Sequence, residues 1–347
     1  DRLIIGLPSG KKQVTFTVPV YRVSCNDCAS HCREELPFCP KWARHTNAVA
    51  RLVIDLRREM CIKAVAAFIG LDWRTVKEIE KHQLEIKYKR IRLKDVRVIG
   101  IDEIYIGKVY KTIVRDLESG AVLFVGKGKG GDALAPFARK LRSSKCKIKV
   151  VAMDMSNGYS AWVKNNLKTA NIVFDHFHII QLMNKKLDKL RRETMNELEE
   201  EEKKKLKRKR FLYLKGEEGL TSEEKSELDA LKEIFEDLST AHAMKEGLRS
   251  IYRTAESEAD AKLLFEGWIE SAKETGIACL NTMANTIRRH LNGILGYWKF
   301  NQITSASMEG FNNKIRWLIG QAFGFHDQEY FRLKIFDLPD CSTVKKI

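Results

Sequence analysis

The chain has 347 residues, enough for two or three domains, and it carries 62 lysines and arginines against 46 aspartates and glutamates, a formal net charge of +16. A chain this basic needs an anionic partner, of which nucleic acid is the first candidate and an anionic membrane surface the second. No apolar run approaches the roughly 18 residues that a membrane-spanning helix needs, and no signal peptide is visible. We therefore exclude an integral membrane protein and expect a cytoplasmic one.

Residues 1–45 are predicted to form a small module of short strands and loops that holds a cluster of cysteines. Four of the eight cysteines fall within one short stretch of this module: Cys25, Cys28, Cys32 and Cys39. In a basic cytosolic protein, clustered cysteines indicate zinc more than disulfides, and a structural zinc site needs four ligands. These four, with His31 as a substitute, are one candidate set of Zn²⁺ ligands.

Residues 46–90 are predicted to be helical and to contain a helix-turn-helix. A short helix over 62–69 is broken by Gly70, and Asp72 caps the next helix, which runs to about His82. Ala66 lets the two helices cross closely, and Gly70 takes the left-handed turn between them. The alternative is a helical pair with a purely structural role. In the DNA-binding interpretation, the contacts come from basic residues of the second helix: Arg74, Lys77 and Lys81.

The hydrophobic period then changes from that of helices to that of strands. Gly107 and the pair Ser119-Gly120 separate three predicted strands, which helix, strand, helix and strand follow. The predicted strands are Val96–Ile106, Lys111–Asp116, Ala121–Val125, Ile148–Met153 and Ile172–Phe174, and the predicted helices are 132–142 and Ser156–Leu167. This is the order of an RNase H-like α/β core, although a fold alone does not establish a function.

Residues 176–290 are predicted to be almost wholly helical and highly charged. Within them, Glu199–Glu202 runs directly into Lys203–Arg210. Such a run is typical of a solvated helix with ion pairs one turn apart, and the alternative is a basic face that follows a DNA backbone.

Two acidic residues lie where predicted strands bring them together. Asp102 lies inside the first strand, where a buried charge is costly unless a metal ion or partner compensates it. Asp154 directly follows the fourth strand. Because the first and fourth strands of an RNase H-like sheet are neighbours, we expect the two carboxylates to converge. Either acid by itself would be interpreted as a surface residue or a structural ion pair.

A third acid, Glu309, lies on the last strongly amphipathic helix, over residues 304–322. Met308, Phe311 and Ile315 form part of its apolar stripe, so the helix is expected to bury one face on the sheet. The opposite, polar stripe holds Glu309 and two residues placed to contact a phosphate, Asn313 and Arg316. Three carboxylates suit two Mg²⁺ (or Mn²⁺) ions, which can activate an attacking oxygen and stabilise a leaving one without a covalent protein nucleophile.

These residues resemble the ISL3 family of bacterial transposases, and the likeness covers nearly the whole chain. It is strongest in four segments: Val98–Glu103, Met153–Tyr159, Phe174–His178, and Met308–Arg316 with the later Ala322–Phe325. The resemblance implies an RNase H-like core with Asp102, Asp154 and Glu309 as the catalytic, metal-binding triad. The long gap between Asp154 and Glu309 implies a helical insertion at 185–295 that divides the core into 91–184 and 296–337.

The resemblance also implies further site residues. Cys25 and Cys28 look like the second half of a zinc-binding module whose first cysteine pair would lie upstream of Asp1, which is the alternative to the local four-cysteine set. His176 and His178, which follow the fifth strand, are expected beside the active site, where they contact DNA or support Asp175, and the alternative is a structural helix start capped by Asp175. Trp298 is expected either to stack on an unpaired base or to pack in the core. Lys314, next to Asn313 and Arg316, completes the predicted DNA contacts.

The resemblance implies a nucleoid-associated DNA transposase that binds the terminal inverted repeats of an insertion sequence, cuts them, and joins the free 3′-hydroxyl to target DNA. Two ends must be handled together, so a homodimer on double-stranded DNA is expected. Two other functions share these features: a DNA-binding regulator with an inactive core, and an RNase H-like nuclease that cuts without joining. An RNA-binding protein would need surfaces that stack single-stranded bases, and no clear set of such residues is visible.

Overall fold

The computed structural model describes residues 1–10 and 12–340. They divide into two compact units. Unit 1 comprises residues 1–91 and the chain from Asn313 onward, and unit 2 comprises Arg92–Asn312. Among the described residues, no helix is both long and apolar enough to span a membrane.

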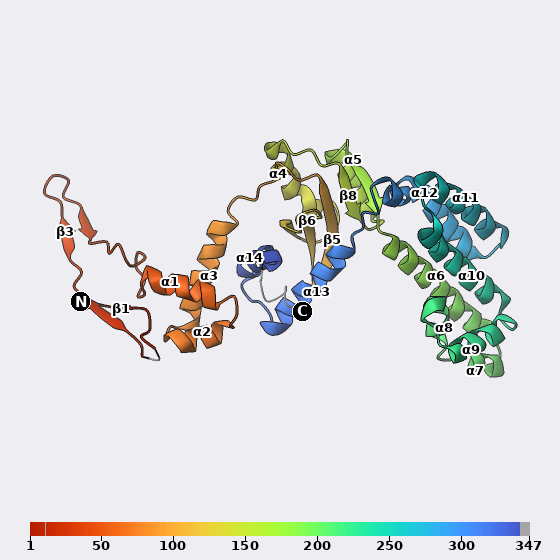
Figure 1. Ribbon diagram of the computed structural model, residues 1–347, viewed down its shortest axis with the longest axis horizontal. Helices are drawn as coiled ribbons and strands as arrows, with labels where there is room; N and C mark the ends of the chain where they lie inside the picture. Colours follow the sequence, from red (N-terminus) through yellow and green to blue (C-terminus); the bar gives the residue numbers. More distant parts are fainter. Residues whose placement is uncertain (11, 341–347) are drawn as a thin grey trace. The chain divides into compact units, whose positions relative to one another are not determined.

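Unit 1 begins with two antiparallel hairpins (Figure 1). The first pairs β1 (Arg2–Ile5) with β2 (Thr15–Val18), and the second pairs β3 (Arg22–Ser24) with β4 (His31–Arg33). Short, mostly exposed strands of this kind bury little apolar area. Residues 1–45 are therefore short strands and loops, as predicted.

Three helices follow: α1 (Asn47–Leu56), α2 (Ile62–Ile69) and α3 (Trp73–Lys87). Gly70 ends α2 with a φ of 77°, a left-handed conformation that favours glycine, and the side chain of Asp72 accepts the backbone N–H of Arg74 at the start of α3. The helices share one small core, formed by Val49, Val53, Val65, Ala66, Ile69 and Val76. The predicted helix–turn–helix geometry is confirmed, with α3 five residues longer than expected.

Unit 1 also contains the last described helix, α14 (Gln328–Asp337), followed by the short turn of helix η3 (Leu338–Asp340). Tyr330 and Leu333 of α14 are buried against Leu84 of α3. The sequence-based boundaries placed residues 296–337 in the core of the sheet domain. In the structure the chain from Asn313 onward groups with the N-terminal helices instead, because α14 buries its apolar face on α3.

Unit 2 contains a five-stranded sheet of mixed direction (Figure 1). Its strands are β5 (Val98–Ile106), β6 (Val109–Asp116), β7 (Val122–Lys127), β8 (Val150–Met153) and β9 (Asn171–Phe174). The order across the sheet is β7-β6-β5-β8-β9: the first three strands are antiparallel, and β8 and β9 run parallel to β5. The predicted neighbouring of the first and fourth strands is confirmed.

Helices cover both faces of this sheet. One face holds η1 (Asp132–Leu134), α4 (Ala135–Ser144) and α5 (Asn157–Asn166), where Tyr159 of α5 donates a hydrogen bond to Glu103 of β5. Successive strand residues point to opposite faces, so Gly100 and Asp102 face the other way. There the first turns of α13 (Ala306–Gln321) pack on β5, with Met308 against Gly100.

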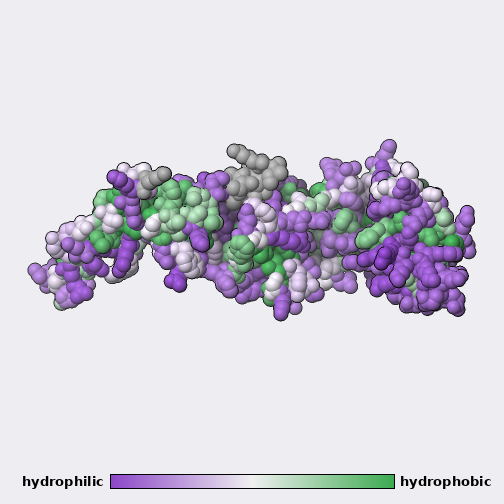
Figure 2. All heavy atoms as spheres, turned by 90° about the horizontal axis from the view of Figure 1, so that it is seen from below, coloured by the Kyte–Doolittle hydropathy of each residue, from purple (hydrophilic) through white to green (hydrophobic). Residues whose placement is uncertain are grey.

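The segment between β9 and α13 is helical, as predicted. It contains α6 (His176–Glu197), α7 (Glu200–Leu206), α8 (Arg210–Leu214), η2 (Glu217–Gly219), α9 (Ser222–Lys232), α10 (Glu236–Thr254), α11 (Glu258–Glu274) and α12 (Ala278–Lys299). Figure 2 shows hydrophilic side chains gathered over these helices. Lysines of the charged run pair with nearby acids, Lys203 with Glu200 and Lys209 with Glu227, in agreement with a solvated, salt-bridged surface.

Candidate functional site

Asp102 and Asp154 lie side by side on neighbouring strands. Ile101 of β5 is the register partner of Met153 of β8, and the strands are parallel, so the next residue on each is one of the two aspartates. Both side chains are partly buried. The predicted convergence of two strand-borne carboxylates is thus present in unit 2.

Among the described residues, Asp102 accepts two hydrogen bonds but forms no ion pair with a lysine or an arginine. One of its oxygens accepts the backbone N–H of Glu103 at 2.7 Å, and the other accepts the Nδ2 of Asn312, also at 2.7 Å. Burial, followed by repulsion from Asp154, raises the pKa of Asp102 to about 6. The site therefore holds an excess of negative charge, which favours binding of a cation.

His178, on the first turn of α6, contacts the second aspartate. Its Nε2 lies 2.5 Å from Oδ1 of Asp154. Burial alone would lower the pKa of His178, but its contact with Asp154 and the charges of Asp175 and Asp102 outweigh that effect, so the pKa is raised. The sequence interpretation had assigned His178 to DNA; in the structure its nearest partner is Asp154.

Helix α13 brings the third acid to the same face of the sheet. Met308 packs against Gly100, and the guanidinium of Arg115 donates to the backbone carbonyl of Ser307 at 2.8 Å. The predicted amphipathic pattern is confirmed, because Met308 and Phe311 are buried while Glu309 is exposed. Glu309 therefore lies, exposed, on the helix that packs beside Asp102.

Asn312 is a site residue that the sequence analysis missed. It is buried on α13 and donates directly to Asp102. The analysis singled out its neighbour Asn313, on the polar stripe. The available signal was an amide immediately after Phe311 on the apolar side of the helix, since a buried polar side chain almost always has a specific partner.

The donor atoms of this site suit Mg²⁺ or Mn²⁺. They are carboxylate and amide oxygens, and one of them, Asn312 Oδ1, is buried without a hydrogen-bond partner among the described residues. No group of three His, Cys, Asp or Glu side chains in the described residues is close enough to hold a metal ion as it stands. Two carboxylates are therefore in place, and the exposed Glu309 would have to turn inward to complete the set.

Trp298 is packed among other aromatic side chains. Its ring stacks on Tyr252 at 5.1 Å between centroids, and Phe265 and Tyr297 lie on other sides of it. Its indole N–H donates to the carbonyl of Ala255 at 2.9 Å. These contacts agree with the core-packing alternative.

The basic residues of α3 differ in their surroundings. Arg74 is exposed, with its guanidinium beside the ring of Trp73. Lys77 and Lys81 both form ion pairs of 3.0 Å with Asp327, the N-cap residue of α14, and each is about one-fifth exposed. Only Arg74 of the three predicted contacts therefore lies open on the surface of unit 1.

The predicted contacts on α13 are exposed or partly so. Arg316 donates to the side-chain oxygen of Asn313 at 2.6 Å, and both are exposed, while Lys314 is half-buried. Arg316 and Asn313 form one polar surface of the helix, as the amphipathic pattern predicted.

The four cysteines of the local zinc candidate do not form one cluster. Cys25 and Cys28 lie in the turn of the β3–β4 hairpin and Cys32 on β4, with the Cys28 sulfur 2.9 Å from the Ser30 hydroxyl. Cys39 is buried elsewhere, where its thiol donates to the carbonyls of Ala43 and His45.

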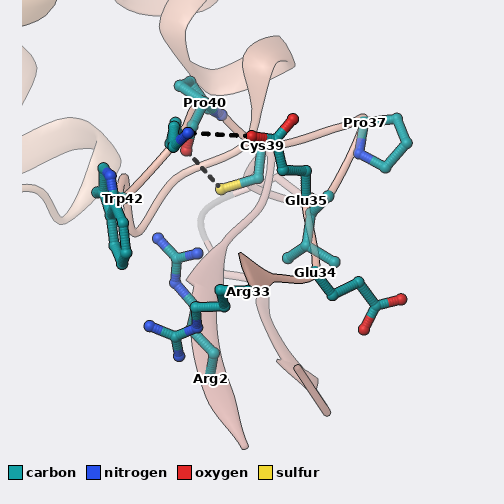
Figure 3. A pocket seen from close by; sticks show the side chains of 10 residues that line it. Arg2, Arg33, Glu34, Glu35, Pro37, Cys39, Pro40 and Trp42 are labelled. Carbon is teal, nitrogen blue, oxygen red and sulfur yellow. Dashed lines mark hydrogen bonds and ion pairs between the residues drawn. The ribbon is translucent and has the colours of Figure 1, made fainter. Parts of the chain in front are cut away.

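Figure 3 shows Cys39 inside a pocket lined by Arg2, Arg33 and Trp42, facing Pro40. The local set is not assembled among the described residues because backbone carbonyls of the loop take up the fourth thiol.

The chain is similar to known transposases over most of its length. Residues 99–335 match the transposase model of the DDE type from the ISL3 family, and residues 34–83 match the helix-turn-helix domain of transposase family ISL3. The transposase for insertion sequence element IS1001 of Bordetella parapertussis is 29% identical over 340 residues, covering 96% of this chain and 83% of the relative. The transposase for IS1557 of Mycobacterium tuberculosis is 26% identical, covering 85% and 72%.

The first of these models spans more than half of the chain, over the sheet, the helical segment and α13. The second includes all of α1 and α2 and most of α3. The chain therefore belongs to the ISL3 family of transposases and carries the family's helix-turn-helix DNA-binding domain.

Proposed function

We propose that this transposase cuts DNA at the ends of its insertion sequence and joins the freed 3′-hydroxyl to target DNA, with Asp102, Asp154 and Glu309 as catalytic carboxylates. The observation that carries the proposal is the adjacency of Asp102 and Asp154 on parallel strands, beside a helix that packs on β5 and bears Glu309. Ordinary structural acids would be paired with lysine or arginine, whereas Asp102 accepts only the backbone N–H of Glu103 and the amide of Asn312 among the described residues.

The arrangement of the sheet supports an RNase H-like core. Three antiparallel strands are followed by two strands parallel to the first, and helices cover both faces. In this proposal the helical segment between β9 and α13 is an insertion into that core. It separates the third carboxylate from the other two in sequence, while the strands and the first part of α13, up to Asn312, still form one unit.

The residues of the site have distinct tasks in this mechanism. Two divalent ions, held by Asp102, Asp154 and Glu309, would activate the attacking oxygen and stabilise the leaving one. Asn312 holds one oxygen of Asp102 by its hydrogen bond and so orients the carboxylate. His178 holds Asp154 from the other side and places a proton donor beside it.

DNA-end recognition is assigned to the helix-turn-helix of unit 1. Arg74 stands at the start of α3, the end of a recognition helix that normally meets base edges and phosphates. Lys77 and Lys81 can serve DNA only by leaving Asp327. The net charge of +16 supports strong, salt-sensitive binding of double-stranded DNA. Because two ends react together, we propose a homodimer on DNA.

We also propose a zinc ion in the N-terminal module, with only Cys25 and Cys28 of the four cysteines as its ligands. Cys25 and Cys28 are close enough to supply one pair of ligands at a hairpin turn. Metal analysis of the purified protein, with Cys28→Ser for comparison, tests this: one equivalent of zinc that the substitution removes would support it, and a zinc-free protein would rule it out.

The test of the main proposal is cleavage of a labelled duplex that carries the element's end, in Mg²⁺, for wild type beside Glu309→Gln. Wild type should cut at the end and yield a joined product with target DNA, while the variant binds without cutting. A nick without joining would favour a nuclease. Binding without cleavage under Mg²⁺ or Mn²⁺ would favour an inactive regulator, and either result would overturn the proposal.

A further inference from the structure

Asp175 forms hydrogen bonds with the starts of two helices that are distant in sequence. It follows β9 directly and is 3% exposed. One carboxylate oxygen accepts the backbone N–H of Phe177 at 2.9 Å, which caps α6. The other accepts both the backbone N–H of Ser305, at 3.1 Å, and its hydroxyl, just before α13 begins. A single buried carboxylate thus joins the starts of α6 and α13.

The two helices carry opposite sides of the candidate active site. From α6, His178 reaches Asp154. From α13, Asn312 reaches Asp102, and Glu309 lies one turn away on the exposed side. The backbone N–H of Asp175 also donates to Met153, the residue before Asp154. Asp175 therefore lies at the start of each helix whose side chain orients one of the two aspartates, although it touches neither carboxylate.

A capping role alone does not explain this arrangement. An N-cap needs one acceptor oxygen, and the Phe177 bond already supplies it for α6. Burial of a carboxylate is costly unless hydrogen bonds satisfy it, and here the bonds come from both helices. Ser305 is itself 4% exposed, so water does not compete for its hydroxyl. The second oxygen serves the connection to α13.

We propose that Asp175 is a positioning residue that sets the spacing between the Asp154 side and the Glu309 side of the metal site. The proposal rests on the proposed catalytic role of the three carboxylates. A metal pair requires oxygens from β5, β8 and α13 at fixed separation, and the Asp175–Ser305 connection holds α13 against the strand ends. Groups that orient metal ligands in this way typically contribute about 10–100-fold to metal affinity or activity.

The primary test compares Ser305→Val with Ser305→Thr. The two side chains have nearly the same shape, and only threonine keeps the hydroxyl that Asp175 accepts. We expect Ser305→Val to cut the labelled DNA end about 10–100-fold more slowly and to bind Mn²⁺ about 10-fold more weakly in its DNA complex. Ser305→Thr should restore both. Mn²⁺ affinity, measured by electron paramagnetic resonance, reads the site without relying on activity.

Ser257→Ala is the matched control for a lost helix cap. Ser257 caps α11 in the same unit by accepting the N–H of Asp260 at 3.1 Å, and α11 carries none of the site residues. It should lower the melting temperature about as much as Ser305→Val and leave cleavage and Mn²⁺ affinity unchanged. Asp175→Asn replaces one accepting oxygen with an NH2 group that faces hydrogen-bond donors. The fraction of this variant that folds should show the same defect as Ser305→Val.

The outcomes separate this proposal from the proposed function. If wild type cuts and binds Mn²⁺ while Ser305→Val matches it in both, Asp175 is only a structural cap and the positioning role is overturned. If Ser257→Ala loses Mn²⁺ affinity as Ser305→Val does, the defect reflects general stability, which also overturns it. If wild type neither cuts nor binds Mn²⁺, both the proposed function and the positioning role fail.

Discussion

Each unit contains an acid that is buried or partly buried, and the surroundings of these two acids are opposite. In unit 1, Glu80 of α3 is held by Arg57 at 2.7 Å and by Lys334 at 2.8 Å, and it accepts the hydroxyl of Tyr330. Burial opposes its ionisation, but the two cations outweigh burial and lower the pKa of Glu80. In unit 2, Asp102 faces a second acid, and its pKa is raised to about 6.

This difference in surroundings distinguishes an acid that stabilises the fold, Glu80, from an acid that is proposed to bind a metal ion, Asp102. The charge of Glu80 is balanced within the folded unit, so its contacts hold α14 on α3 and leave nothing for a ligand to satisfy. The charge of Asp102 is not balanced in this way, and a divalent cation would supply what is missing. A compensated buried acid is thus expected to support stability, and an uncompensated one to reduce it in return for function.

The largest expected effect comes from Asp102→Asn. Cleavage of the DNA end should fall at least about 1000-fold, because a metal ligand is lost. The free energy of unfolding should stay constant or rise by about 1 kcal/mol, since repulsion from Asp154 is relieved. End cleavage and urea unfolding measure the two quantities, with Glu103→Gln as control on the opposite face of β5. If Asp102→Asn unfolds more easily than wild type and still cuts DNA, Asp102 is a structural acid and not a catalytic one.

Glu80→Gln should have the opposite signature. Removing the acid leaves Arg57 and Lys334 buried without their partner, which typically costs about 3–5 kcal/mol. We expect unit 1 to unfold and end binding to be lost. Unit 2 should keep its melting transition, as differential scanning calorimetry would show. Glu78→Gln on the exposed side of the same helix is the control. Unchanged stability in Glu80→Gln would mean that the ion-pair cluster does not hold α14.

The features that depend on nearby residues in the chain could be predicted from the sequence. Asp102 interrupts an apolar strand and Asp154 ends another, and strand order then places them together. Gly70 and Asp72 likewise mark a turn and a cap through backbone preferences that act within a few residues. Such signals need no knowledge of distant contacts.

The missing part depends on contacts between distant segments. The apolar residues of α14 indicate that the helix is buried but not that α3 covers it, about 250 residues away in the chain. For the same reason Lys77 and Lys81 resembled free DNA contacts until Asp327 was placed beside them. Asn312 was overlooked because its partner, Asp102, is equally remote.

The buried His242 should make unit 2 less stable as the pH falls, by about 3 kcal/mol, and the raised pKa of Asp102 in the same unit acts the other way. His242 of α10 is fully buried in unit 2, and burial, helped by the charge of Lys245, lowers its pKa to about 4. The unfolded chain takes up this proton near pH 6.5 and the folded chain only near 4. Acidification through that window therefore favours unfolding, by about 3 kcal/mol in total.

Glu80 also loses its stabilising contribution on acidification, but only below its unfolded pKa near 4.5. Because Asp102 opposes His242 over much the same pH range, urea unfolding at pH 7, 5.5 and 4.5 should compare wild type with His242→Leu, in which unit 2 should lose less stability on acidification. His242→Leu should abolish the difference between wild type at pH 7 and at pH 4.5 that this histidine causes. A His242→Leu variant with the full wild-type pH dependence would show that other groups are responsible.

The smallest expected effects concern the basic residues of α3, of which Lys77 is paired with an acid and Arg74 is exposed. Arg74→Ala should weaken end binding by about 10-fold and reduce the slope of affinity against salt concentration by about one ion. Lys77→Ala should change affinity little, because its charge is already satisfied by Asp327 at 3.0 Å, and exposed or half-exposed ion pairs contribute at most about 1 kcal/mol. Fluorescence anisotropy across a salt series measures both.

Equal losses for Arg74→Ala and Lys77→Ala would mean that Lys77 leaves Asp327 when DNA arrives. Asp327→Asn would then raise the affinity, because it frees Lys77 and Lys81 in advance, and α14 would regulate the recognition helix that it also stabilises.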